Sequence, residues 1–178
     1  MPYSREQLVN KIYATADAYG IDRAIAYAQL KRESGFRDDV IYGPFVAGAG
    51  ERGLAQFTPG TWARFSNEPH TAAYDPDKSL RAWGQYMRFL LNMFGGRYDL
   101  ALAGYNGGEN RECLRAGSLS CAPSGAQRYA REVLAAAGKS PTTITTTSNS
   151  EGSGLSDWLQ YWPYAAACLA LIWFLSDD

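Results

Sequence analysis

Glu33-Ser34-Gly35-Phe36 is the segment best suited to acid chemistry, because it places one carboxylic acid on the last turn of an apolar helix. A carboxylate is disfavoured at the negative end of the helix macrodipole, and burial beside Phe36 disfavours it further. We therefore expect the pKa of Glu33 to be raised, so that its protonated form persists toward neutral pH. Such an acid can donate a proton to a leaving group. The alternative is an ordinary solvated glutamate at a helix end.

The helix that carries Glu33 has clear boundaries in the sequence. Asp22 is a suitable N-cap, apolar residues follow with helical spacing from Ile25, and Gly35 supplies a left-handed exit. An earlier helix is expected to begin at Ser4, where Gln7 three residues later completes a capping box. The acid is thus expected at the end of the second helix.

Two polar segments follow. Residues 53–59 read Gly-Leu-Ala-Gln-Phe-Thr-Pro, which predicts a short loop entering a helix with Thr58 as its N-cap. Gln56 in this loop offers an amide that both donates and accepts. After a long helix that begins near Asp75-Pro76, another is expected from Asp99 until it breaks at residues 104–108, Gly-Tyr-Asn-Gly-Gly. These glycines allow a ligand to approach the backbone closely. A last helix is predicted from near Ser124, with Gln127 placed for a second capping box, to Gly138.

In this order the segments resemble the soluble lytic transglycosylase family, whose domain is mainly α and lysozyme-like. The resemblance runs from about Leu8 to Leu134. It implies that Glu33 is the catalytic acid and base, and that Tyr129, in its Gln-Arg-Tyr-Ala context, hydrogen-bonds this acid. It also implies a set of glycan-binding residues, namely Gln56, Tyr105, Asn106, Phe57 and Ser34.

The resemblance implies a reaction that needs only one carboxyl group. Glu33 would protonate the oxygen between N-acetylmuramic acid and N-acetylglucosamine in peptidoglycan, while the substrate's acetamido group stabilises the positive anomeric carbon. The Glu33 carboxylate would then take the proton of the muramyl 6-hydroxyl, giving a 1,6-anhydro sugar. The chain departs from the family pattern at Ala55, where methionine is usual, at Gly107, where alanine is usual, and at residues 48–52, which hold no helping serine.

Other functions stay open. A muramidase that uses water needs a second carboxylate, for which Asp38, Asp39 and Glu51 are candidates, although an exposed loop position is the commoner case for Glu51. A non-catalytic glycan-binding or virion assembly protein with the same fold is a further alternative. The single histidine, His70, rules out a zinc site built on several histidines. A Cys-His peptidase would need Cys113 or Cys121 beside His70. It is disfavoured because nothing near either cysteine marks it as an activated thiol.

Composition fits one compact domain without nucleic acid or a cofactor as partner. The chain has 178 residues, 46% of them hydrophobic, and a net charge of −1. All 17 Lys and Arg residues precede residue 140, yet they form no dense basic patch. Cys113 and Cys121 lie in a Gly- and Ser-rich loop and are either a disulfide, which would indicate an oxidising compartment, or two free thiols.

The chain is expected to divide into a domain at 1–138, a flexible linker at 139–156 and a membrane anchor at 157–178. Residues 158–175 carry no charge and have Trp and Tyr near their ends, as in a single membrane span. The N-terminus lacks an apolar secretion segment. We therefore expect an anchored enzyme that acts in the periplasm, delivered by a bacteriophage virion during entry, with other virion proteins as candidate partners.

Overall fold

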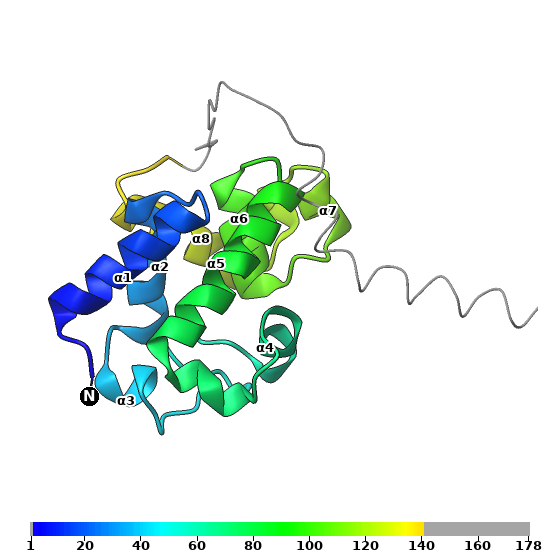
Figure 1. Cartoon of the computed structure of the whole chain (residues 1–178). Helices are drawn as coiled ribbons and strands as arrows, with labels where there is room; N and C mark the ends of the chain where they lie inside the picture. The colour runs from blue at the N-terminus through cyan, green and yellow to red at the C-terminus, as the bar shows by residue number, and fades with distance from the viewer. Residues whose placement is uncertain (1, 141–178) are drawn as a thin grey trace, which may run out of the picture. The chain divides into compact units, whose positions relative to one another are not determined.

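The computed structural model describes residues 2–140, and within that range the chain is mainly helical (Figure 1). A single isolated β-bridge joins Arg52 to Phe57 in this part of the chain. The α-helices are α1 Arg5–Ala18, α2 Arg23–Ser34, α3 Asp38–Ile41, α4 Pro59–Phe65, α5 Pro76–Met93, α6 Tyr98–Gly107, α7 Glu112–Arg115 and α8 Ser124–Ala136, and the 3-10 helices are η1 His70–Tyr74 and η2 Leu119–Cys121.

Local capping explains where the first helices begin and end. The Ser4 side chain accepts from Gln7 N while the Gln7 side chain accepts from Ser4 N, so the predicted capping box is confirmed. The Asp22 carboxylate accepts from the first backbone N–H groups of α2. At the other end Gly35 adopts φ 59°, the left-handed exit that its sequence position predicts. These contacts fix Glu33 in the last turn of α2.

The helices after the loop also begin as predicted. The Thr58 hydroxyl accepts from Thr61 N, and Pro59 occupies the first turn of α4. Asp75 caps α5 in the same manner, and its carboxylate accepts from the backbone N–H groups of Asp77 and Lys78. Helix α5 ends at Met93, just before the expected glycine pair.

The predicted end of α6 is confirmed, whereas the capping box predicted for α8 is wrong. Helix α6 begins at Tyr98 and ends at Gly107, within the glycine-rich segment 104–108 where the sequence predicts its end. Glycine at 104 serves packing, because a Cβ there would lie 3.0 Å from the Phe94 ring. Helix α8 has no second capping box, since Ser124 lies inside the helix and Pro123 is its N-cap. The Gln127 amide instead turns back and donates to the carbonyl oxygens that precede the helix.

One core holds the five long helices together. Helix α5 packs on α1 and α6, α2 packs on α1 and α8, and α6 packs on α8 (Figure 1). The largest fully buried side chains include Trp62, Trp83, Tyr98 and Phe57. Helices α2, α6 and α8 thereby meet around the end of α2, which is the end that carries Glu33.

The predicted linker and membrane anchor fall almost entirely on residues 141–178, which lie outside the described residues. Across residues 2–140, no helix has the length and apolar character needed to cross a membrane.

Candidate active site

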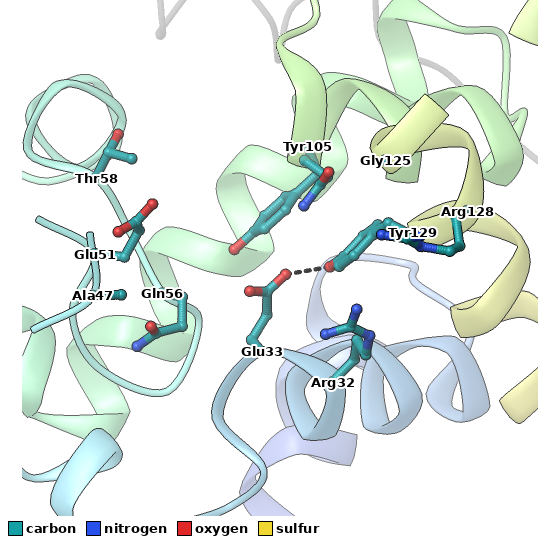
Figure 2. Close-up of a pocket in the computed structure, with 11 residues that line it drawn as sticks. Arg32, Glu33, Ala47, Glu51, Gln56, Thr58, Tyr105, Gly125, Arg128 and Tyr129 are labelled. Carbon is teal, nitrogen blue, oxygen red and sulfur yellow. Dashed lines mark hydrogen bonds between the residues drawn. The ribbon is translucent and has the colours of Figure 1, made fainter. Parts of the chain in front are cut away.

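A pocket of about 360 Å³ opens at the end of α2 (Figure 2). Its walls come from three places: the end of α2, the loop from residue 47 to residue 58, and the facing parts of α6 and α8. The lining residues are Arg32, Glu33, Ala47, Glu51, Gln56, Thr58, Tyr105, Asn106, Gly125, Arg128 and Tyr129. The structure thus brings together Glu33, Gln56, Tyr105, Asn106 and Tyr129 from distant parts of the sequence.

Glu33 is the acid at the centre of this pocket. Figure 2 shows its side chain rising from α2 between the loop that carries Gln56 and the helix that carries Tyr129. Burial of the carboxyl group raises the pKa of Glu33 to about 7, and the negative charge of Glu51 adds to the rise. The Tyr129 hydrogen bond and the Arg32 charge act in the opposite direction. Glu33 is therefore present in both protonation states near neutral pH, as a group that serves as acid and then as base requires.

Tyr129 contacts the acid directly. Its hydroxyl donates a hydrogen bond to Glu33 Oε1, across 96 positions of sequence. Tyr129 is buried, and both burial and the nearby Glu33 charge raise the pKa of its phenol well above the usual value. The phenol therefore stays protonated and acts as a neutral hydrogen-bond donor. It fixes one carboxyl oxygen of Glu33 while the other remains available to the pocket.

Gln56 lies on the opposite wall in a strained turn. Its backbone has φ 50°, in the left-handed region, and its side-chain Nε2 donates to Gly53 O at 2.8 Å. Gly53 permits this turn, because a Cβ at that position would lie 1.8 Å from the backbone oxygen of Ala73. The amide of Gln56 thus helps to hold the loop in shape as well as lining the pocket.

Tyr105 and Asn106 complete the cleft from α6. The Tyr105 hydroxyl donates to the backbone oxygen of Ala55 at 2.6 Å, and its ring lies against Phe57 and Tyr86. Burial and the Glu33 charge raise the pKa of the Tyr105 phenol well above its usual value. Asn106 is exposed, so its amide is available to a ligand.

Ser34 and Phe57 lie elsewhere than predicted. Ser34 is buried, and its hydroxyl donates to Leu30 O and accepts from Phe36 N. Phe57 is 2% exposed and packs on Trp62. Neither side chain lines the pocket, so direct glycan contact fits neither residue. Their side chains stabilise the helix end and the loop that present Glu33 and Gln56.

The structure adds residues that the sequence patterns did not single out. Arg32 and Arg128 line the pocket beside Glu33 and Tyr129, and Arg32 Nε lies 3.1 Å from Glu132 Oε2. In the sequence, the only sign of a role for these two arginines is that each directly precedes a motif residue, Glu33 or Tyr129. Of the three candidate second carboxylates, Glu51 lines the pocket, whereas Asp38 and Asp39 do not.

The cysteine loop lies apart from the pocket lining. Cys113 and Cys121 form a disulfide, which resolves the two alternatives that the sequence left open. The bridge ties α7 to η2, just before α8 begins. It therefore constrains the segment that leads to Tyr129.

Solved structures with this fold support the mainly helical, lysozyme-like prediction. The chain is similar to an inactive variant of the lytic transglycosylase Slt from Pseudomonas aeruginosa, with 19% identity and a TM-score of 0.59. It is also similar to the 70-kDa soluble lytic transglycosylase of Escherichia coli, with 20% identity and a TM-score of 0.60. A third similar structure is a 70-kDa soluble lytic transglycosylase in complex with bulgecin A, with 21% identity and a TM-score of 0.62. Each match covers 82% of this chain and 26% of the solved chain, so this chain spans about a quarter of their length.

Sequence comparison identifies the domain itself. Residues 10–116 match the profile of the family described as the transglycosylase SLT domain. The matched segment includes Glu33, Gln56, Tyr105 and Asn106, and it ends before α8, which carries Tyr129. Because the match covers more than half of the sequence, the chain belongs to the transglycosylase SLT domain family.

Proposed function

We propose that this protein is a peptidoglycan lytic transglycosylase in which Glu33 is the catalytic acid and base. The observation that carries the proposal is the Tyr129 hydroxyl bonded to Glu33 in an open pocket, where burial raises the pKa of that acid to about 7. Family membership and the fold of the lytic transglycosylases support the same reaction class.

The proposed reaction proceeds without water. Protonated Glu33 gives its proton to the oxygen that links N-acetylmuramic acid to N-acetylglucosamine, and the bond from that oxygen to the anomeric carbon breaks. The Glu33 carboxylate then takes the proton of the muramyl 6-hydroxyl, whose oxygen bonds to the anomeric carbon. The products are an N-acetylglucosamine end and an anhydromuramyl end, and Glu33 is again protonated.

The remaining pocket residues are assigned to substrate binding. Gln56 and Asn106 supply amides that can donate to and accept from sugar hydroxyl and acetamido groups. Tyr105 and Tyr129 provide aromatic surface beside the acid. No cofactor takes part in this scheme, because proton transfer and the substrate's own acetamido group supply the chemistry.

Hydrolysis is the second candidate, and Glu51 is the observation that favours it. Its carboxylate lines the same pocket as Glu33, on the loop wall (Figure 2). A second carboxylate in this place can activate a water molecule that attacks the anomeric carbon. The product would then carry a reducing muramyl end.

Mass spectrometry of the products separates these outcomes. Purified peptidoglycan is digested with the full chain and with its Glu33→Gln variant. Anhydromuramyl ends that disappear in the variant are expected from the proposal. Reducing ends would mean hydrolysis, and an intact protein that cleaves nothing would favour a glycan-binding or assembly role.

The biological setting is a separate proposal that rests on the sequence alone. The uncharged residues 158–175 support a membrane anchor, and an enzyme held there would act on the wall in the periplasm. Delivery by a bacteriophage particle is the route we propose for local wall penetration. Quantifying the protein in purified particles and in bacterial inner membranes tests this, and its presence only in the latter would contradict the proposal.

A further inference from the structure

Gln29 is a fully buried amide one turn before Glu33 on α2. Its Oε1 accepts a hydrogen bond from the Trp83 indole Nε1 at 3.2 Å. An indole nitrogen only donates, so this contact fixes the orientation of the amide, with oxygen toward Trp83 and Nε2 turned away. The Nε2 group is buried and makes no hydrogen bond of regular geometry within residues 2–140. A buried donor without a hydrogen-bond acceptor lowers the stability of the folded state, so its presence needs an explanation.

The phenol of Tyr129 is the group that the Gln29 amide meets. Gln29 and Glu33 are four residues apart, so they lie on the same face of α2, and this helix packs on α8. Burial is the main cause that raises the pKa of Tyr129, whereas hydrogen bonding with Gln29 lowers it. An N–H that donates to the phenol oxygen has this effect, because it makes the hydroxyl a stronger donor.

We propose that Gln29 is a positioning residue that donates from Nε2 to the Tyr129 oxygen and so directs the Tyr129 hydrogen to Glu33. The donors then run in one direction, from Trp83 on α5 through Gln29 and Tyr129 to the acid. In this arrangement the Tyr129 oxygen is occupied by an incoming N–H, so its own proton points at Glu33 Oε1.

This relay favours the carboxylate form of Glu33. The Tyr129 bond already lowers the pKa of Glu33 against the effect of burial. Strengthening that bond stabilises the carboxylate that must accept the proton of the attacking hydroxyl. The catalytic consequence rests on the proposed function, whereas the effect on the Glu33 pKa does not.

Other charged and titratable groups also face Glu33, and they are unchanged in the test variants. Arg32 comes from α2, Tyr105 from α6, Arg128 from α8 and Glu51 from the loop. Any shift on replacing Gln29 therefore reports its own contribution, provided that all variants are compared at the same ionic strength.

The direct test is the pKa of Glu33, measured by carbon NMR of labelled glutamate carboxyl groups in the full chain. The Glu33 signal is assigned by its loss in Glu33→Gln. Gln29→Met keeps the length of the side chain and removes the amide, and we expect the Glu33 pKa to rise by roughly half a unit. In a Tyr129→Phe background the same replacement is expected to have no effect. An unchanged pKa, or an equal shift without the Tyr129 hydroxyl, would overturn the proposal.

A second variant controls for damage to the core. Gln29→Met leaves the buried Trp83 N–H without its acceptor, so Gln29→Met with Trp83→Phe removes both polar groups together. The Glu33 pKa is expected to rise in this variant too, whereas a return to the native value would overturn the relay. In cleavage assays, activity falls as pH rises. The pH at which it falls is expected to be higher in the variants than in the native protein, by the same amount as the Glu33 pKa. If the pKa shifts as expected in a protein that cleaves nothing, the proposed function fails while the relay stands.

Discussion

The Tyr105 hydroxyl is bonded to the backbone oxygen of Ala55, 50 positions earlier in the chain, at 2.6 Å. This bond joins α6 to the turn that holds Gln56, so two walls of the pocket are fastened together next to the acid. Under the proposed function, a glycan strand that enters the pocket meets a loop that is already held in place, which reduces the entropy lost on binding.

Removing the Tyr105 hydrogen bond should weaken function more than stability. Tyr105→Phe keeps the ring contacts and loses one hydrogen bond, for which we expect about 1 kcal/mol of lost stability. We also expect a several-fold rise in KM for glycan cleavage, because the loop with Gln56 becomes mobile. Tyr74→Phe is the matched control, since it also removes a phenol bond to a backbone oxygen but does not line the pocket. Equal kinetic effects from the two variants would contradict this role for Tyr105.

Glu33 should make the protein less stable as pH rises. Its pKa is raised from 4.5 to about 7 by burial in the folded state, so the folded state binds the proton more tightly than the unfolded state. The contribution to stability is complete below about pH 4.5 and is lost as pH rises through about 7, by about 3 kcal/mol at most. Glu33→Gln is expected to remove this loss. Urea unfolding from pH 4 to pH 8 measures the free energy of unfolding at each pH, with a substitution at an exposed site, Glu6→Gln, as control. Parallel curves of this free energy against pH for the native protein and Glu33→Gln would contradict the prediction.

Glu109 should have the opposite dependence on pH. It is 4% exposed, accepts from Arg64 Nη1 at 2.5 Å and accepts from the Tyr86 hydroxyl at 3.0 Å. Burial raises its pKa, but these bonds outweigh burial and leave the pKa below the usual value. Its contribution to stability is therefore present above about pH 4.5 and is lost as pH falls through the lowered pKa.

Glu109→Gln tests this network. We expect a loss of roughly 2 kcal/mol at pH 7, because the Arg64 charge is left without its partner, and a smaller loss in acid. The matched control is Glu132→Gln, whose carboxylate is 45% exposed in its ion pairs and for which we expect at most about 0.5 kcal/mol. Denaturation at several pH values measures both variants, and a Glu109→Gln effect that does not depend on pH would count against the assignment.

Glu51 should tune the acid without determining the product. Its negative charge contributes to the raised pKa of Glu33, so Glu51→Gln is expected to lower that pKa and to move the loss of activity to lower pH. Anhydromuramyl ends should persist as the product. Asp38→Asn is the control, because Asp38 is exposed and does not line the pocket. A variant that loses all cleavage while its Glu33 pKa is unchanged would instead make Glu51 a reacting group.

Capping residues made much of the fold predictable. Asp22, Gly35 and Thr58 act on backbone groups within three or four positions, so the sequence contains both partners of each contact. The last turn of α2 and the raised pKa of Glu33 could therefore be anticipated, although burial rather than the end of the helix is the largest cause of the shift.

Contacts across helices were beyond such local patterns. The partner of Gln29 is Trp83, 54 positions away, and Glu109 meets Arg64 across 45 positions. A motif also says which residues occur together but not which way each side chain points. For this reason the motif predicts Ser34 in the glycan site, although its hydroxyl bonds to its own helix.

Isotope labelling tests the central claim most directly. The full chain digests purified peptidoglycan in water enriched in heavy oxygen, and the new ends are reduced at once with borohydride and weighed by mass spectrometry. If Glu33 passes the proton between two groups of the substrate, the new muramyl ends carry no heavy oxygen and resist reduction. New ends that carry one heavy oxygen and are reduced would contradict the account and show that water attacks the anomeric carbon.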